Sequence, residues 1–251
     1  MRVAVFSDVH GNLTALEAVL ADIEEQAVDE IVFAGDLCMA GPRPAECLER
    51  VQQLGIPAVY GNTDHWLLGI TEPPDRVKPI AVWTLAQLND EQQAWLRSLP
   101  LTHRISPTGL TSDDLLIVHA NPKDAYWLIF PSEEDQMARY GRIRQADSEL
   151  DEWLEGTEAA MMAYGHLHIP GIRHWRQLIL ANISSVNLPG DDDPRAKYGL
   201  LNWEDSRWHL ERRYVKFDIN PEIAALKEAK LPGWESFLEV IEEKGYFPQN
   251  V

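Results

Sequence analysis

The stretch Arg2-Val3-Ala4-Val5-Phe6-Ser7-Asp8-Val9-His10-Gly11-Asn12 decides the fold. A short Val-rich apolar run ends abruptly at polar residues, and a helical pattern begins at Leu13. This order is typical of a buried parallel strand that leads through a turn into a helix. Ligands bind just beyond the carboxyl ends of such strands. Because Asp8 and His10 are two residues apart, we expect their side chains to point the same way from a still extended strand and to form half of a metal site.

Two further apolar segments end in the same manner. Residues 30–35 lead into Asp36, and residues 57–60 lead into Gly61-Asn62. Helical patterns cover 13–26, where Asn12 is placed as the cap, and 44–54. The first third is therefore predicted to be β-α-β-α-β, with polar residues at each strand exit.

The rest of the chain is predicted as one domain over 1–251. Two helical pieces fill 78–99, strands cover 101–105, 115–118 and 159–164, and consecutive strands over 172–217 suit a second sheet. Residues 122–156 are the least regular and could form a lid insertion over the site. Residues 220–251 are predicted as a C-terminal tail with two helices.

Composition limits the classes of function. The 251 residues carry a net charge of −18, with 45% apolar and 25% charged residues, as in globular proteins. That charge argues against a surface that coats nucleic acid. No apolar run is long enough to span a membrane, and no signal peptide is recognised. The two cysteines suggest no disulfide, so we expect a cytoplasmic protein.

The predicted strand exits concentrate metal-binding residue types. They supply Asp8, His10, Asp36, Asn62, His119, His166 and His168. This mixed nitrogen and oxygen set without thiolates suits Mn, Fe or Zn better than Mg or Ca. Seven ligands exceed the need of one ion, and a carboxylate can bridge two ions about 3.5–4 Å apart. Taken singly, Asp8 could stabilise a helix dipole, Gly35-Asp36 and Gly61-Asn62 could be ordinary turns, and His119 could be a core histidine. The alternate histidines His166 and His168 at a strand end suit metal binding better than a purely structural role.

The order of these motifs resembles that of the calcineurin-like metallophosphoesterases. The matching motifs are Asp8-x-His10, Gly35-Asp36, Gly61-Asn62, His119 and Gly165-His166-x-His168. Longer strings are similar to the small bacterial and archaeal phosphodiesterase branch: Ser7 to Asn12, Gly41-Pro42-x-Pro44, Asn121-Pro122, Asn182-x-x-Ser185-Val186 and Asp193 to Ala196. The resemblance extends from residue 2 to about 216. It implies an α/β fold in which two mixed β-sheets form a four-layer sandwich with flanking helices.

The resemblance also implies roles for individual residues. Two divalent metal ions, Mn by preference and Fe or Zn as alternatives, would be the cofactors. Asp8, His10 and His168 would hold one ion, Asn62, His119 and His166 the other, and Asp36 would bridge them. A hydroxide between the ions would attack the phosphorus of a small phosphate ester. The implied catalytic set is Asp36, Asn62 and His166, with Asn62 and Asn12 as substrate contacts.

Departures from the family pattern bear on the substrate. Many members have His directly after Gly-Asn to assist the leaving group, where this chain has Thr63. Protein phosphatases have an Arg just after Gly-Asn, and this chain has none after Gly61-Asn62. These differences favour a phosphodiesterase over the alternative, a phosphomonoesterase acting on protein or nucleotide. The usual Gly before Ser185 is Ser184. A non-catalytic metal-binding scaffold is a further alternative, against which the presence of every ligand type argues.

Overall fold

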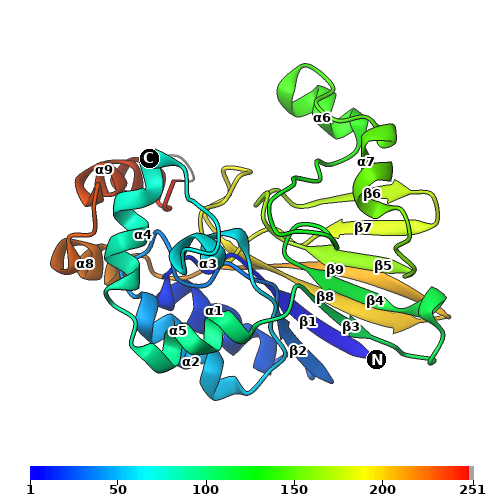
Figure 1. Ribbon diagram of the computed structural model, residues 1–251, viewed down its shortest axis with the longest axis horizontal. Helices are drawn as coiled ribbons and strands as arrows, with labels where there is room; N and C mark the ends of the chain where they lie inside the picture. The colour runs from blue at the N-terminus through cyan, green and yellow to red at the C-terminus, as the bar shows by residue number, and fades with distance from the viewer. Residues whose placement is uncertain (249–251) are drawn as a thin grey trace.

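The computed structural model describes residues 1–248 and contains two mixed β-sheets with helices, an α/β fold (Figure 1). The first sheet has the order β2 (Glu30–Phe33), β1 (Arg2–Phe6), β8 (Ala196–Glu204) and β9 (Arg207–Val215). The second has the order β3 (Thr102–Ile105), β4 (Leu115–Val118), β5 (Met161–Tyr164), β7 (Leu178–Asn182) and β6 (Gly171–Trp175). In each sheet, parallel strands are joined by antiparallel partners. The expected pair of mixed sheets is confirmed.

The assignment of strands to sheets differs from the expectation in one respect. The strands within 172–217 do not all enter the second sheet, because β8 and β9 extend the first one, with Val3 of β1 opposite Leu201 of β8. Residues 196–201 of β8 are all buried, so both faces of this part of the strand need cover. A place beside β1, between a helical layer and the second sheet, provides that cover.

The predicted strand at 57–60 is also wrong. Ala58 makes only an isolated bridge to Phe33, and no strand forms there. Pro57 has no N–H to donate to a ladder, and the chain turns at Gly61 into α3 (Asn62–Leu67). The carboxyl end of this segment still lies beside that of β2, because Val59 N donates to Phe33 O at 3.0 Å.

Three apolar layers hold the sheets and helices together. Helices α1 (Leu13–Glu24), α2 (Pro44–Leu54) and α5 (Asp90–Ser98) share a core with the outer face of the first sheet. A second core, including Val5 and Ile117, lies between the sheets. A third joins the outer face of the second sheet to α7 (Asp147–Leu154) through Leu150. This order of helices, sheet, sheet and helix is the four-layer arrangement expected from the sequence.

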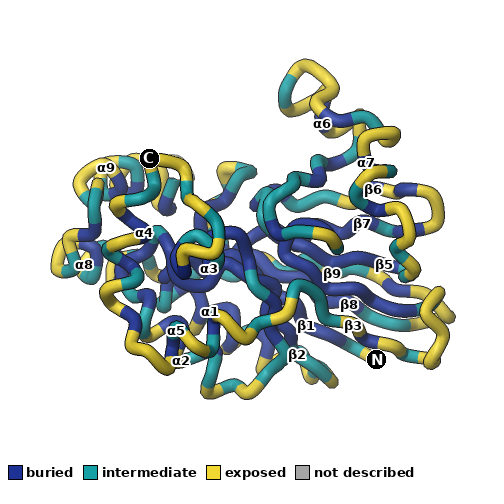
Figure 2. Tube along the Cα trace, viewed as in Figure 1, coloured by how far each residue is buried: buried dark blue, intermediate teal, exposed yellow. Residues whose placement is uncertain are grey.

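The remaining helices lie at the ends of the sandwich. Helices α4 (Lys78–Leu85), α8 (Asn220–Ala229) and α9 (Trp234–Lys244) form one apolar cluster with Met39 and Leu188, at the left of Figure 1. Helix α6 (Glu133–Tyr140) extends away from the sheets and is largely exposed (Figure 2). Two short 3-10 turns, η1 (Asp75–Val77) and η2 (Thr111–Asp113), complete the elements. Among the described residues, no helix has the length and apolar character needed to cross a membrane.

Candidate metal centre

The predicted ligands converge through left-handed turns rather than through strand alternation. Strand β1 already ends at Phe6. The φ angles of five candidate ligands are positive, at 59° for Asp8, 47° for His10, 61° for Asp36, 61° for His166 and 58° for His168. The expectation of an extended Asp8-x-His10 segment was therefore wrong, although both side chains reach one site. Non-glycine residues in this conformation are strained and cluster at functional sites.

Glycines allow these turns to approach one another closely. A Cβ at Gly61 would clash with Asp36 Oδ1, and a Cβ at Gly165 would clash with Asp8 Oδ2 and Ser7 Oγ. The Gly-Asn and Gly-His pairs of the sequence therefore have a steric basis, since only glycine admits the carboxylates of Asp8 and Asp36 at these places.

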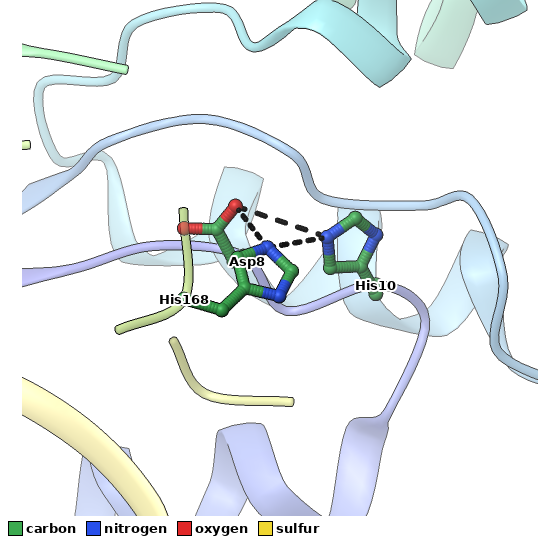
Figure 3. A group of neighbouring side chains, drawn as sticks. All are labelled: Asp8, His10 and His168. Atoms are coloured by element: carbon green, nitrogen blue, oxygen red, sulfur yellow. Dashed lines mark hydrogen bonds and ion pairs between the residues drawn. The ribbon is translucent and has the colours of Figure 1, made fainter. Parts of the chain in front are cut away.

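The first group of candidate ligands is Asp8, His10 and His168 (Figure 3). Asp8 Oδ1 lies 2.9 Å from His168 Nε2 and 3.8 Å from His10 Nε2, and the two Nε2 atoms are 3.4 Å apart. All three residues are buried. Ligand atoms of the group lie within 4.8 Å of one another, close enough to share one ion.

The second group is Asp36, His119 and His166, with Asn62 beside it. Asp36 Oδ2 lies 3.4 Å from His119 Nε2 and also 3.7 Å from His10 Nε2 of the first group. Asp36 therefore faces both groups, which is the position that a bridging carboxylate requires.

Four histidines are oriented by backbone carbonyls. His10 Nδ1 lies 2.8 Å from Met39 O, His119 Nδ1 2.9 Å from Ala34 O, His168 Nδ1 2.7 Å from Leu188 O and His166 Nε2 2.9 Å from Tyr126 O. A carbonyl can only accept, so each of these ring nitrogens carries the proton. When a ring is neutral, its other nitrogen presents a lone pair to the centre, as in metal-ligating histidines.

The surroundings of Asn62 give an independent test of fit to a metal. When the side-chain oxygen of Asn62 points into the centre, this acceptor atom faces only other acceptors, namely Asp36 Oδ2, His119 Nε2 and His166 Nδ1. With the amide nitrogen inward, it donates to these atoms at 3.3, 3.0 and 2.9 Å. A cation among four acceptor atoms would satisfy the first arrangement, so the donor set fits a metal ion.

The electrostatics of the buried centre favour ionised carboxylates. Burial by itself raises the pKa of Asp36, but the charge and hydrogen bond of His119, with the charge of His10, outweigh it and lower this pKa to about 2. Burial, together with the charge of His119, lowers the pKa of His166 to about 4. An ionised Asp36 and a neutral His166 are the ligand forms that a divalent ion requires.

Asn12 lies outside this set. Its Oδ1 accepts from Ala15 N at 2.9 Å and caps α1, as expected, and its Nδ2 donates to Asn187 Oδ1 at 3.2 Å. The side chain is fully buried and does not line the cavity beside the centre. The expected contact of Asn12 with substrate stays a prediction.

Several supporting residues were missed in the sequence. The buried carboxylate of Asp64 accepts from the backbone N–H groups of Gly61 at 2.8 Å and Asp36 at 3.1 Å, and so joins two of the ligand loops. Its place three residues after the N-cap Gly61 was the available signal. The Tyr126 carbonyl, which orients His166, has no sequence signal, because any residue could supply it.

A cavity of about 330 Å³ opens beside the two groups. Of segment 122–156 only Leu128 lines it, while α7 packs on the outer face of the second sheet. His65 does not line it either, since its ring stacks on Tyr60 at 3.9 Å and its Nδ1 lies 3.1 Å from the Tyr126 hydroxyl. The proposed lid therefore remains a prediction.

Two sheets that bring paired Asp and His groups together beyond the carboxyl ends of their strands form an arrangement that is typical of metal-dependent hydrolases. Residues 1–206 match the model of the calcineurin-like phosphoesterase superfamily domain. The chain belongs to this superfamily.

The chain is similar to proteins from several organisms. An uncharacterized protein of Methanocaldococcus jannaschii is 29% identical over 239 residues, which is 92% of this chain and 94% of the relative. A symmetrical bis(5'-nucleosyl)-tetraphosphatase of Methylococcus capsulatus is 33% identical over 149 residues, 57% of this chain and 49% of the relative. This chain thus matches only about half of that protein's length. The crystal structure of a metallophosphoesterase from Sphaerobacter thermophilus is similar with a TM-score of 0.70 and 27% identity, covering 95% of this chain and 98% of that one.

Proposed function

We propose that this phosphoesterase-family chain is a dinuclear metal-dependent phosphodiesterase that hydrolyses a small phosphate ester. The observation that carries the proposal is the anchoring of four histidines by backbone carbonyls, which turns the remaining ring nitrogens toward two adjoining carboxylates. The name of the Methylococcus capsulatus relative specifies a phosphate chain with a nucleosyl group at each end. This name supports a substrate whose phosphate is substituted on both sides rather than a phosphomonoester.

The residues divide into two sites that share Asp36. Asp8, His10 and His168 would hold one divalent ion, and Asn62, His119 and His166 the other. Mn is the preferred ion, with Fe or Zn as alternatives. Bound divalent ions would supply an activated water and positive charge opposite the phosphate.

Thr63 supports a diester substrate. It is 5% exposed, lines the cavity, and its Oγ1 has no hydrogen-bond partner within the described residues. A hydroxyl can donate a hydrogen bond to a phosphate oxygen, but at neutral pH it is a poor proton donor to a leaving group. The site therefore suits leaving groups that depart without strong acid assistance. Asn62, next to it on α3, offers its amide to the same phosphate.

The proposal is tested with metal-stripped protein and Mn²⁺, Zn²⁺, Fe²⁺ or Mg²⁺ added in turn, with bis(p-nitrophenyl) phosphate and p-nitrophenyl phosphate as substrates. We expect diester turnover with Mn²⁺. The variants Asp36→Asn and His166→Ala should each lose about 100-fold or more in kcat/KM, since each removes a ligand. The exposed His174 provides the matched control, His174→Ala. Circular dichroism establishes that each variant is folded.

The same experiment separates the alternatives. Preference for the monoester would replace the diesterase proposal with a phosphomonoesterase. Two tightly bound ions without turnover of either ester would indicate a non-catalytic scaffold. Full activity of either ligand variant would overturn the assigned centre. A cytoplasmic location belongs to the proposal and rests on the two cysteines, which are buried and free.

A further inference from the structure

The cavity beside the metal centre has two dissimilar walls. One wall consists of metal-centre residues, including Asp36, Asn62 and His166. The other consists of apolar side chains from α3, η1, α4 and α9: Trp66, Val77, Ile80 and Phe237. Helices α4 and α9 lie side by side at the left of Figure 1 and belong to one apolar cluster. A volume of about 330 Å³ suits a small organic group rather than a macromolecule.

Arg76 is the one cationic side chain of Lys or Arg type that lines this cavity in the described chain. It is exposed, and within residues 1–248 it makes no hydrogen bond or ion pair. Lys78, two residues further on, instead pairs with Glu72 at 2.6 Å and with Asp75 at 2.9 Å. An arginine that lines the cavity of the metal centre without a protein partner is available to an anion.

We propose that Arg76 and the apolar wall form a subsite for the part of the substrate beyond the scissile phosphate. This subsite takes a second phosphate at Arg76 and an aromatic ring against Trp66 and Phe237. The substrate class is then an aromatic group joined through a second phosphate to the scissile phosphate, which carries a further substituent on its other side: the chemistry of a phosphate chain substituted at both ends. The placement of the scissile phosphate at the metal centre rests on the proposed function. Binding of the second phosphate by Arg76 can be measured without any hydrolysis.

The physical argument is complementarity. Guanidinium binds phosphate through two parallel N–H donors, and a flat apolar face stacks on a base. The residues of the wall lie between 66 and 80 and at 237, and Phe237 lies outside the matched family region 1–206. The wall thus combines α3, η1 and α4 of the family domain with α9 of the C-terminal tail. It can give this chain a preference among phosphate substrates that the metal ligands alone do not specify.

The test is calorimetric binding of AMP and α,β-methylene-ADP to the Mn²⁺-loaded protein. We expect the diphosphate analogue to bind wild type about tenfold more tightly than AMP, because it adds one charged hydrogen-bonded contact. In Arg76→Ala this ratio should fall to near one, and in Arg76→Lys it should keep part of its value. Arg142→Ala removes an exposed arginine that does not line the cavity and should leave the ratio unchanged.

The aromatic part has its own readout. Trp66→Ala should weaken both ligands by a similar factor, on the order of tenfold, and so leave their ratio unchanged. An unchanged ratio in Arg76→Ala would overturn the subsite. Tight binding of the analogue by a protein that does not hydrolyse bis(p-nitrophenyl) phosphate would contradict the proposed function while supporting this subsite.

Discussion

At the scale of single residues, the centre depends on strained backbone held by hydrogen bonds. Each non-glycine residue in the left-handed conformation costs on the order of 1 kcal/mol. The surroundings offset that cost, because Asp8 N donates to Gly35 O at 2.9 Å and His166 N donates to Asp8 Oδ2 at 3.0 Å. Ligand loops from both sheets thus hold one another in place, and the geometry exists only in the folded chain.

Ser184, at the position where the family resemblance led us to expect Gly, shows the same conformation with φ of 69°. Its Oγ donates to His168 O at 3.0 Å. Ser184→Ala keeps the strain and loses this bond, so we expect a loss of about 1 kcal/mol in the free energy of unfolding. Ser184→Gly loses the bond but relieves the strain and should be nearly neutral. Urea unfolding of the two variants checks this, and equal losses would show that the strain is negligible.

At the scale of elements, the C-terminal tail supports the first ligand group from behind. Met39 and Leu188 supply the carbonyls that orient His10 and His168, and their side chains pack in one cluster with Leu226 of α8. The tail is further joined to α1 by Glu222, which is fully buried and accepts from Thr14 N at 2.7 Å. The tail therefore stabilises the position of two candidate ligands without contacting an ion.

Leu226→Ala tests this support. We expect a loss of about 2–5 kcal/mol in the free energy of unfolding, as for other buried leucines. We also expect about tenfold weaker metal binding at the group Asp8, His10 and His168, since their orienting partners loosen. Leu96→Ala, in a core without these carbonyls, is the matched control for lost stability. A two-site Mn²⁺ titration in which both variants behave alike would refute the specific role of the tail.

A second contact between elements makes stability depend on pH. Asp22 of α1 accepts from Tyr198 of β8 at 2.6 Å and from Arg213 of β9 at 2.9 Å. The hydrogen bonds from Arg213 lower the pKa of Asp22 against the opposing effect of burial. A carboxyl with a lowered folded-state pKa stabilises the fold above its unfolded pKa, near 4, and this contribution is lost as the pH falls through the folded value.

Asp22→Asn should therefore destabilise the protein by about 1–2 kcal/mol at pH 7, since the partners are partly exposed. The difference from wild type should shrink as the pH is lowered from 5 toward 2. Urea unfolding at several pH values measures it. A difference that is constant across this range would show that the ion pair does not titrate.

Much of the order of elements was predictable because it depends on local periodicity, whereas the strand predicted at 57–60 does not form and α3 was not expected. The buried run at Arg2–Phe6 and the apolar face of α1 carry their own signals, as do the polar residues that follow each strand. The partner of β8 was not predictable, since β1 and the second sheet offer similar apolar edges. The ligand types could be read from the sequence, whereas the carbonyl of Tyr126 and the cavity position of Arg76 depend on contacts between distant segments.

At the scale of the whole molecule, the centre lies where the two sheets meet. Asp8, His10 and Asp36 follow strands of the first sheet, and His119, His166 and His168 follow strands of the second. Each candidate ion group contains residues from both sheets. A bound ion would therefore join the sheets at one edge of a sandwich whose interior is otherwise held by apolar contacts.

Metal binding should consequently raise the stability of the entire fold. A ligand at 100 times its Kd, which binds only the folded state, adds about 2.7 kcal/mol for each site. We expect the thermal midpoint to rise with added Mn²⁺ and to return after treatment with a chelator. Asp36→Asn should show a much smaller rise, because it weakens the ligand that faces both groups, whereas His174→Ala should respond as wild type. Equal midpoints with and without Mn²⁺ would mean that Mn²⁺ does not bind the folded state in preference to the unfolded one, and so that no ion joins the sheets, since a ligand that binds only the native state must raise the midpoint.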